Sequence, residues 1–130
     1  MTLDTEHRRL CHRLFDALEQ GDVAAVNACY APDMTMWANF TGQESTREEN
    51  LAAITTGKGM HRRRTYNDRI INTFDDGFVI QYTLNGVMTT GHKGALWICI
   101  VAKCKDGKIT RIDEYMDSSK FAAWMGGPKQ

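Results

Sequence analysis

The first residues of the chain carry a helical pattern of apolar positions. Apolar side chains between Leu3 and Glu19 recur at steps of three and four residues, which predicts an amphipathic helix with one buried stripe. Gly21 is expected to end this helix. Asp22 then stands where the N-cap of a second, shorter helix is needed, and that helix is expected to run through Cys29.

The next segment changes to the alternation of a β-strand. Between Met34 and Phe40 two sets of side chains alternate, so the segment is expected to have one face toward a cavity and one toward an outer layer. A capping box at Ser45 or Thr46, with a glutamate three residues later, then opens a third helix. Gly57 and Gly59 are expected to close it.

The second half of the chain has the pattern of a β-meander. Strands are expected at residues 65–74, 78–88, 95–104 and 108–117. Short turns such as Asp106-Gly107 join them as consecutive hairpins, which predicts an antiparallel sheet. A short helix at 118–125 and a frayed tail at 126–130 are expected to follow.

One of these strands is apolar on both of its faces. Leu96 to Ala102 contains no charged side chain, so we expect helices to cover one face and a second subunit the other, giving a homodimer. Helices followed by a long meander predict a single α+β domain over residues 1–130. A strongly curved antiparallel sheet with N-terminal helices across it would enclose a cone-shaped apolar cavity, the default site for a hydrophobic small-molecule ligand.

Charge and composition exclude several classes of function. The chain has 16 basic and 16 acidic residues, and its one basic cluster, Arg62-Arg63-Arg64, is short, so we expect no nucleic-acid binding. The N-terminal segment has no apolar run that would act as a signal peptide or membrane span, so we expect a cytoplasmic protein with no membrane partner.

The cysteines lie in periodic apolar segments at irregular spacing, which favours free thiols over disulfides. His7 and Cys11 are one helical turn apart, but no second pair of metal ligands with finger-like spacing follows them. We therefore expect no metal and no cofactor.

The order of these elements resembles a known family. Together with the segments Tyr30-Ala31-Pro32-Asp33 and Asp113-Glu114-Tyr115-Met116-Asp117, it is similar to the SnoaL-like branch of the nuclear transport factor 2-like superfamily over nearly the whole chain. That resemblance implies the cone-shaped fold and a cofactor-independent enzyme of the cyclase, isomerase, dehydratase or hydrolase class. Some relatives only bind ligands or dimerise, so a non-catalytic binding or dimerisation module is the alternative.

The resemblance can be tested branch by branch. The positions that match the ketosteroid isomerase stations are Leu14, Ala38 and the neighbourhood of Cys99, and none of these can do the required proton chemistry. In the limonene epoxide hydrolases a Tyr-x-Asn segment and a closing aspartate hold the attacking water; here Asn39 and Asp117 match them. Trp37 replaces the tyrosine, and Gln81-Tyr82-Thr83 stands where those enzymes have an Arg-x-Asp pair. In the polyketide cyclases an aspartate removes a proton next to a carbonyl group, often with the help of a histidine; Asp117 and His92 are the approximate matches.

Asp117 is therefore the leading candidate for a general base. We expect it to point inward with a raised pKa; the alternative is that it caps the helix beginning at Ser118. Asn39 would hold a water or a carbonyl group near it, or else be a turn residue at a strand end. Asp113 and Arg111 share a strand face with Asp117 and would orient it, or form a surface ion pair.

Aromatic and aliphatic side chains supply the candidate ligand contacts. His92, between two glycines, completes the catalytic candidates, with an exposed loop position as its alternative. The predicted substrate-binding residues are Trp37, Phe15, Leu18, Tyr82, Trp97 and Tyr115.

Overall fold

The computed structural model describes residues 2–125. Its helices are α1 (Leu3–Gln20), α2 (Val23–Cys29), α3 (Arg47–Met60) and α4 (Ser118–Trp124). Its strands are β1 (Tyr30–Ala38), β2 (Gln43–Thr46), β3 (His61–Phe74), β4 (Gly77–Met88), β5 (Lys93–Lys105) and β6 (Lys108–Met116). The expected tail at 126–130 lies outside the described residues.

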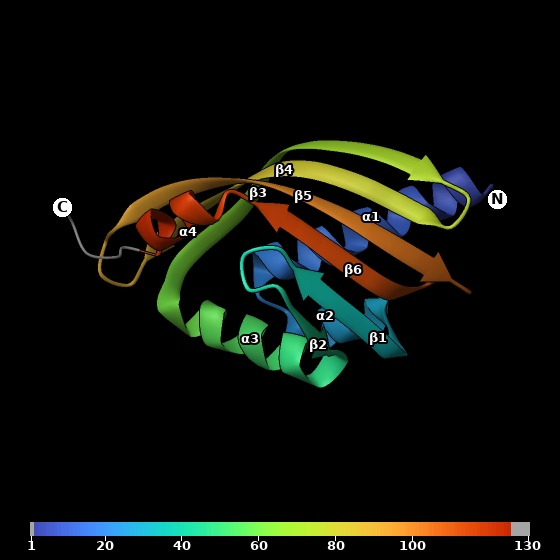
Figure 1. Cartoon of the computed structure of the whole chain (residues 1–130), viewed down its shortest axis with the longest axis horizontal. Helices are drawn as coiled ribbons and strands as arrows, with labels where there is room; N and C mark the ends of the chain where they lie inside the picture. The colour runs from blue at the N-terminus through green and yellow to red at the C-terminus, as the bar shows by residue number, and fades with distance from the viewer. Residues whose placement is uncertain (1, 126–130) are drawn as a thin grey trace.

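The strands form one open sheet in the order β2-β1-β6-β5-β4-β3. The hairpins from β3 to β6 are antiparallel, as predicted. The expectation of a wholly antiparallel sheet is wrong, because β1 pairs with β6 in parallel and with the unpredicted short strand β2 in antiparallel fashion. Figure 1 shows α1 and α2 behind the sheet, α3 below it, and α4 at the end where β5 begins.

Local sequence signals set the helix ends. The side chain of Thr2 accepts from Thr5 N–H at the start of α1, and Gly21 ends that helix with a left-handed φ of 67°. Thr46 and Glu49 form the capping box of α3. The glycines expected to close α3 lie inside it, and the helix continues to Met60.

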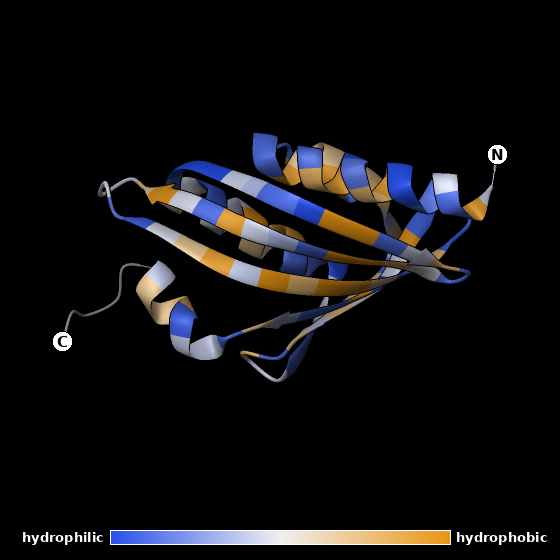
Figure 2. Cartoon of the chain, turned by 90° about the horizontal axis from the view of Figure 1, so that it is seen from above, coloured by the Kyte–Doolittle hydropathy of each residue, from blue (hydrophilic) through white to orange (hydrophobic). Residues whose placement is uncertain are grey.

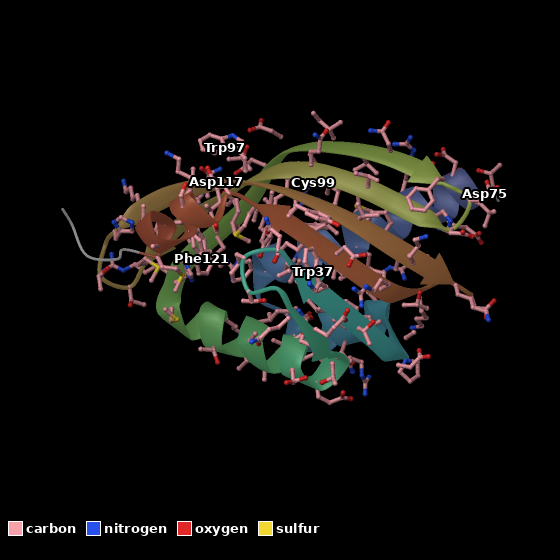
Figure 3. The ribbon with its side chains drawn as sticks, viewed as in Figure 1. Trp37, Asp75, Trp97, Cys99, Asp117 and Phe121 are labelled. Atoms are coloured by element: carbon pink, nitrogen blue, oxygen red, sulfur yellow. The ribbon has the colours of Figure 1, made fainter. Side chains whose placement is uncertain are left out.

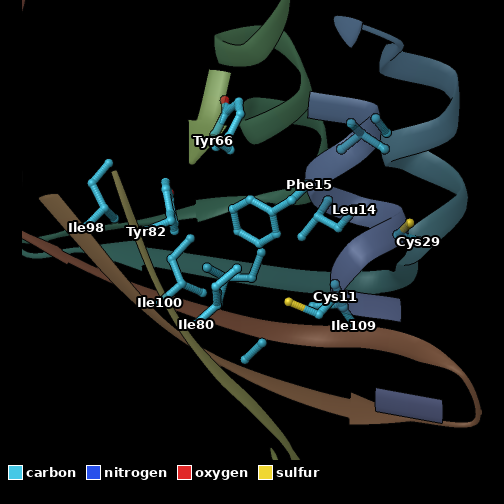
Figure 4. Packing of buried hydrophobic residues seen from close by; sticks show 14 of the residues in the cluster. Cys11, Leu14, Phe15, Cys29, Tyr66, Ile80, Tyr82, Ile98, Ile100 and Ile109 are labelled. Carbon is cyan, nitrogen blue, oxygen red and sulfur yellow. The ribbon is translucent and has the colours of Figure 1, made fainter. Parts of the chain in front are cut away.

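The core lies between α1 and the concave face of the sheet. Leu14 and Phe15 are almost fully buried against Tyr66, Tyr82 and the inward-facing residues of the strands (Figure 4). Figure 2 shows the matching pattern, with the apolar side of α1 turned toward the sheet.

Arg69 holds α1 against β3 near an irregularity in that strand. Asp68 has a φ of 56°, and the pairing with β4 shifts between Asn67 and Ile70. The Arg69 guanidinium donates to Asp16 (2.9 Å) on α1 and to the carbonyl of Tyr66 (2.9 Å), so it joins the helix to the strand at this point.

Candidate functional site

A cavity of about 410 Å³ lies between the concave face of the sheet and the helices. The strands supply most of its wall, α1 and α3 cover it, and Phe121 and Trp124 of α4 lie at its end. Most of the lining side chains are aliphatic or aromatic, because the inward positions of β1, β4, β5 and β6 are apolar. A cavity of this size and character suits a small organic molecule.

Three carboxyl groups lie in the cavity wall, and two of them have partners. Glu49 accepts the backbone N–H of Thr46 in the capping box (2.9 Å). Glu44 is bonded to the guanidinium of Arg111. Glu114 on β6 is the third, and within residues 2–125 it forms no ion pair.

The environment of Glu114 suits a group that exchanges protons near neutral pH. The side chain is partly buried and lines the cavity. Burial raises the pKa of Glu114 from its usual 4.5 to about 7, while the positive charge of Arg64 opposes the rise. Since a general acid or base works best with a pKa near the working pH, Glu114 is the strongest candidate in the cavity.

Tyrosine hydroxyls accompany this carboxyl group. Tyr30, Tyr66 and Tyr82 all line the cavity, and burial raises the pKa of each of them, so they stay protonated at neutral pH. The Tyr30 hydroxyl donates to Asn50 (2.7 Å). Protonated phenols on an apolar wall are hydrogen-bond donors for a carbonyl oxygen.

Asp117 is not in this cavity. It is exposed at the N-cap of α4, where its carboxylate accepts the backbone N–H (3.0 Å) and the hydroxyl (2.6 Å) of Ser119. These hydrogen bonds lower the pKa of Asp117. The expectation of an inward, desolvated base is therefore wrong, and the helix-cap alternative describes this residue.

The other catalytic candidates also have structural partners elsewhere. Asn39 is exposed and joins the ends of β1 and β6, donating to the carbonyl of Met116 and accepting its N–H, both at 2.9 Å. Asp113 is bonded to Arg111 (2.8 Å), as the surface-pair alternative describes. The Nε2–H of His92 donates to the carbonyl of Ala123 (2.8 Å), which ties the β4–β5 loop to α4. None of these side chains lines the cavity.

The predicted ligand contacts divide between three places. Leu18 and Tyr82 line the cavity, whereas Phe15 lies in the core beside it. Trp37, Trp97 and Tyr115 belong to the outer face of the sheet; Trp97 is 68% exposed, and Trp37 packs against Tyr115 at 5.5 Å between ring centroids. In Figure 3, Trp37, Trp97 and Cys99 lie over the sheet face that is turned away from α1.

The sequence reasoning missed Glu114 and Arg64. A usable signal was present in β6, where the apolar residues Ile112 and Met116 flank Glu114 at two-residue spacing and mark its face as inward. For Arg64 the corresponding signal is Tyr66, two residues along β3 on the same face, with both residues lining the cavity.

Residues 2–125 contain no cluster of histidine, cysteine or acidic side chains suited to a metal ion. All four cysteines are free thiols. None of the described helices is both long and apolar enough to span a membrane.

Known proteins share the sequence pattern and the fold of this chain. The sequence profile of the SnoaL-like domain matches residues 11–112. No curated protein matches the chain.

Solved structures resemble it over nearly its full length. A candidate polyketide cyclase from Xanthomonas campestris pv. campestris is 20% identical, with a TM-score of 0.85 over 95% of this chain and 99% of that one. An LEH-like epoxide hydrolase of M. tuberculosis is 19% identical, with a TM-score of 0.77 over 97% and 94% of the respective chains. A protein of ketosteroid isomerase-like fold from Catenulispora acidiphila, in complex with trimethylamine, is 17% identical, with a TM-score of 0.80 over 92% and 93%. At these identities the likeness shows the fold.

Proposed function

Because this chain belongs to the SnoaL-like family, we propose that its cavity binds a small, largely apolar organic molecule and that Glu114 transfers a proton on that molecule. The observation that carries the proposal is the position of Glu114: it is the one carboxyl group of the cavity wall without a partner in residues 2–125.

The reaction class follows from the chemistry of the wall. The Glu114 carboxylate would take a proton from a carbon next to a carbonyl group, so the C–H bond breaks and its electron pair moves to the carbonyl oxygen as an enolate. A tyrosine hydroxyl, from Tyr82 or Tyr66, would donate to that oxygen. Glu114, now a carboxylic acid, would return the proton to another carbon of the enolate, which completes an isomerisation. In a cyclisation the enolate carbon would instead bond to a second carbonyl carbon of the same molecule, whose oxygen takes the proton. In a dehydration the C–O bond at the β-carbon would break, and the leaving hydroxyl would take the proton as water.

The neighbouring structures support this class without defining the substrate. A polyketide cyclase, an epoxide hydrolase and a ketosteroid isomerase-like protein use the same fold. The Arg-x-Asp pair of the epoxide hydrolases has no counterpart at Gln81-Tyr82-Thr83, and this favours proton transfer on carbon over epoxide opening. The alternative remains a binding module in which Glu114 only donates a hydrogen bond as a carboxylic acid.

The test uses 2-tetralone, a small apolar ketone whose α-protons exchange with solvent under base catalysis. Exchange in D₂O is followed by proton NMR for the wild type, for Glu114→Gln, and for Asp117→Asn as the matched control. We expect the wild type to accelerate exchange, Glu114→Gln to remove the acceleration and Asp117→Asn to keep it.

The proposal and its alternative separate in two ways. Equal rates for the wild type and Glu114→Gln would show that Glu114 is not the base. Binding of 2-tetralone without any accelerated exchange would favour the binding module.

A further inference from the structure

Among residues 2–125, Arg64 is the only lysine or arginine that lines the cavity. It stands on β3 two residues before Tyr66, and it also borders a smaller adjoining pocket between the end of α1 and the end of α3. Its position at the boundary of the two pockets places a permanent positive charge beside a largely apolar ligand volume.

The surroundings of Arg64 hold the guanidinium without neutralising it. The guanidinium carbon lies 5.7 Å from the ring centroid of Tyr66 and 5.5 Å from that of Trp124. Gly57 leaves room for it, since a Cβ at this position would lie 3.1 Å from Nη1 of Arg64. These contacts orient the side chain and supply no counter-charge.

No carboxylate in residues 2–125 forms an ion pair with Arg64. Its Nε is buried and has no hydrogen-bond partner in that part of the chain. Glu114 is close enough to feel the charge of Arg64, but the two form no ion pair. A buried donor without an acceptor costs free energy, and a guanidinium matches a carboxylate through two parallel hydrogen bonds.

We infer that the ligand of this cavity carries a carboxylate group, which pairs with Arg64 while its apolar body fills the rest of the cavity. This inference rests on the proposed function in so far as the cavity is a ligand site. It does not need Glu114 to transfer a proton.

The approach to Arg64 is also positively charged. Lys58, Arg62 and Arg63 line the adjoining pocket together with Arg64, in a protein whose formal net charge is zero. Glu19, the acid in this pocket, is already bonded to Tyr66 N–H (3.0 Å) on β3. Basic side chains grouped beside a site raise the local concentration of anionic ligands there.

The opposing explanation is that Arg64 only supports Trp124 and the end of the cavity by stacking. The two explanations separate with a pair of probes of the same shape and different charge, 2-naphthoate and 2-naphthamide. Binding is measured by isothermal titration calorimetry at pH 6 on the wild type, Arg64→Gln, Arg64→Lys and the control Lys105→Gln, an exposed residue of β5 that lines neither pocket.

We expect the wild type to bind 2-naphthoate at least about tenfold more tightly than 2-naphthamide, the scale of a charge-assisted hydrogen-bonded pair. Arg64→Gln should reduce this ratio to about one by weakening naphthoate binding alone, and unchanged naphthamide binding shows that the variant is folded. Arg64→Lys should keep part of the preference, because it keeps the charge and loses the two-pronged geometry. Lys105→Gln should keep nearly all of it, because it removes a positive charge outside both pockets.

A wild-type ratio near one, a ratio that survives Arg64→Gln, or no measurable binding of naphthoate would each overturn the inference. Glu114→Gln distinguishes this failure from failure of the proposed function: it should abolish 2-tetralone exchange and retain the preference for naphthoate. If Glu114→Gln abolishes 2-tetralone exchange while the wild type shows no preference for naphthoate, the proposed function stands and only this inference is overturned.

Discussion

The buried carboxyl group of Glu114 makes the stability of the protein depend on pH in a direction opposite to that of most acids. Its pKa in the folded state is about 7, against 4.5 when it is exposed. Between these values the folded state holds the proton more tightly than the unfolded state does. The contribution of this group to stability is therefore full below about pH 4.5 and is lost as the pH rises to about 7.

The size of the effect follows from the same two pKa values. Each pH unit between 4.5 and about 7 is worth about 1.4 kcal/mol, so ionising Glu114 inside the protein costs about 3 kcal/mol. Glutamine has nearly the same shape and cannot ionise. Glu114→Gln should thus have about the stability of the wild type at pH 4.5 and exceed it by about 3 kcal/mol at pH 8.

The assay is urea denaturation of both proteins across this pH range, followed by circular dichroism. Other titrating groups are common to the two proteins and cancel in their difference. Asp117→Asn is the matched control, because an exposed cap with a lowered pKa should give a difference from wild type that is flat above pH 4.5. A flat difference for Glu114→Gln as well would refute the reasoning, since it would mean that Glu114 titrates as it does in water.

Other consequences of the structure can be measured directly. The exposed apolar side chains of the outer sheet face, Trp97 among them, predict a homodimer through that face. Light scattering should give twice the chain mass for the wild type and the mass of a single chain for Trp97→Asp. A monomeric wild type would contradict the prediction. Asp117→Ala should lower the melting temperature and Asp117→Asn should leave it nearly unchanged, because asparagine also caps helices; equal effects would contradict the cap. Arg69→Ala should destabilise the fold by about 2 kcal/mol in urea, since it removes the guanidinium's hydrogen bonds to Asp16 on α1 and to the Tyr66 carbonyl on β3. A loss of under about 0.5 kcal/mol would show that the contact contributes little.

The alternation of apolar and polar residues in the first strand predicted its two faces, but the sequence did not predict which strands lie beside it. In β1 the set Met34, Met36 and Ala38 faces the core and cavity, and Trp37 faces outward, so the two expected faces are present. The parallel pairing of β1 with β6 was not predictable in the same way. Turn residues specify hairpins between consecutive strands, but β1 and β6 are separated along the chain by a helix and four strands, and no local pattern specifies that contact.

One extra residue in β6 determines which acidic side chain of this segment faces the cavity. Ile109 and Ile112 are both buried, although strict alternation would turn them to opposite faces. The pairing with β5 shifts by one residue here, so Thr110 has no opposite residue on β5. Because of this extra residue, the positions that face inward change from odd to even numbers before Ile112.

This β-bulge decides which acidic side chain of the strand faces a ligand. After the bulge, Glu114 follows Ile112 on the inward face, while Asp113 lies on the outward face with Arg111 as its ion-pair partner. Beyond the strand, Asp117 is bonded to the first turn of α4. Asp113 and Asp117 both have such partners, whereas Glu114 loses solvation and forms no ion pair in residues 2–125. An unpaired acid that destabilises the fold at neutral pH is what a site of proton transfer requires, and this is why Glu114, rather than the better-matched aspartates of the motif, carries the functional proposal.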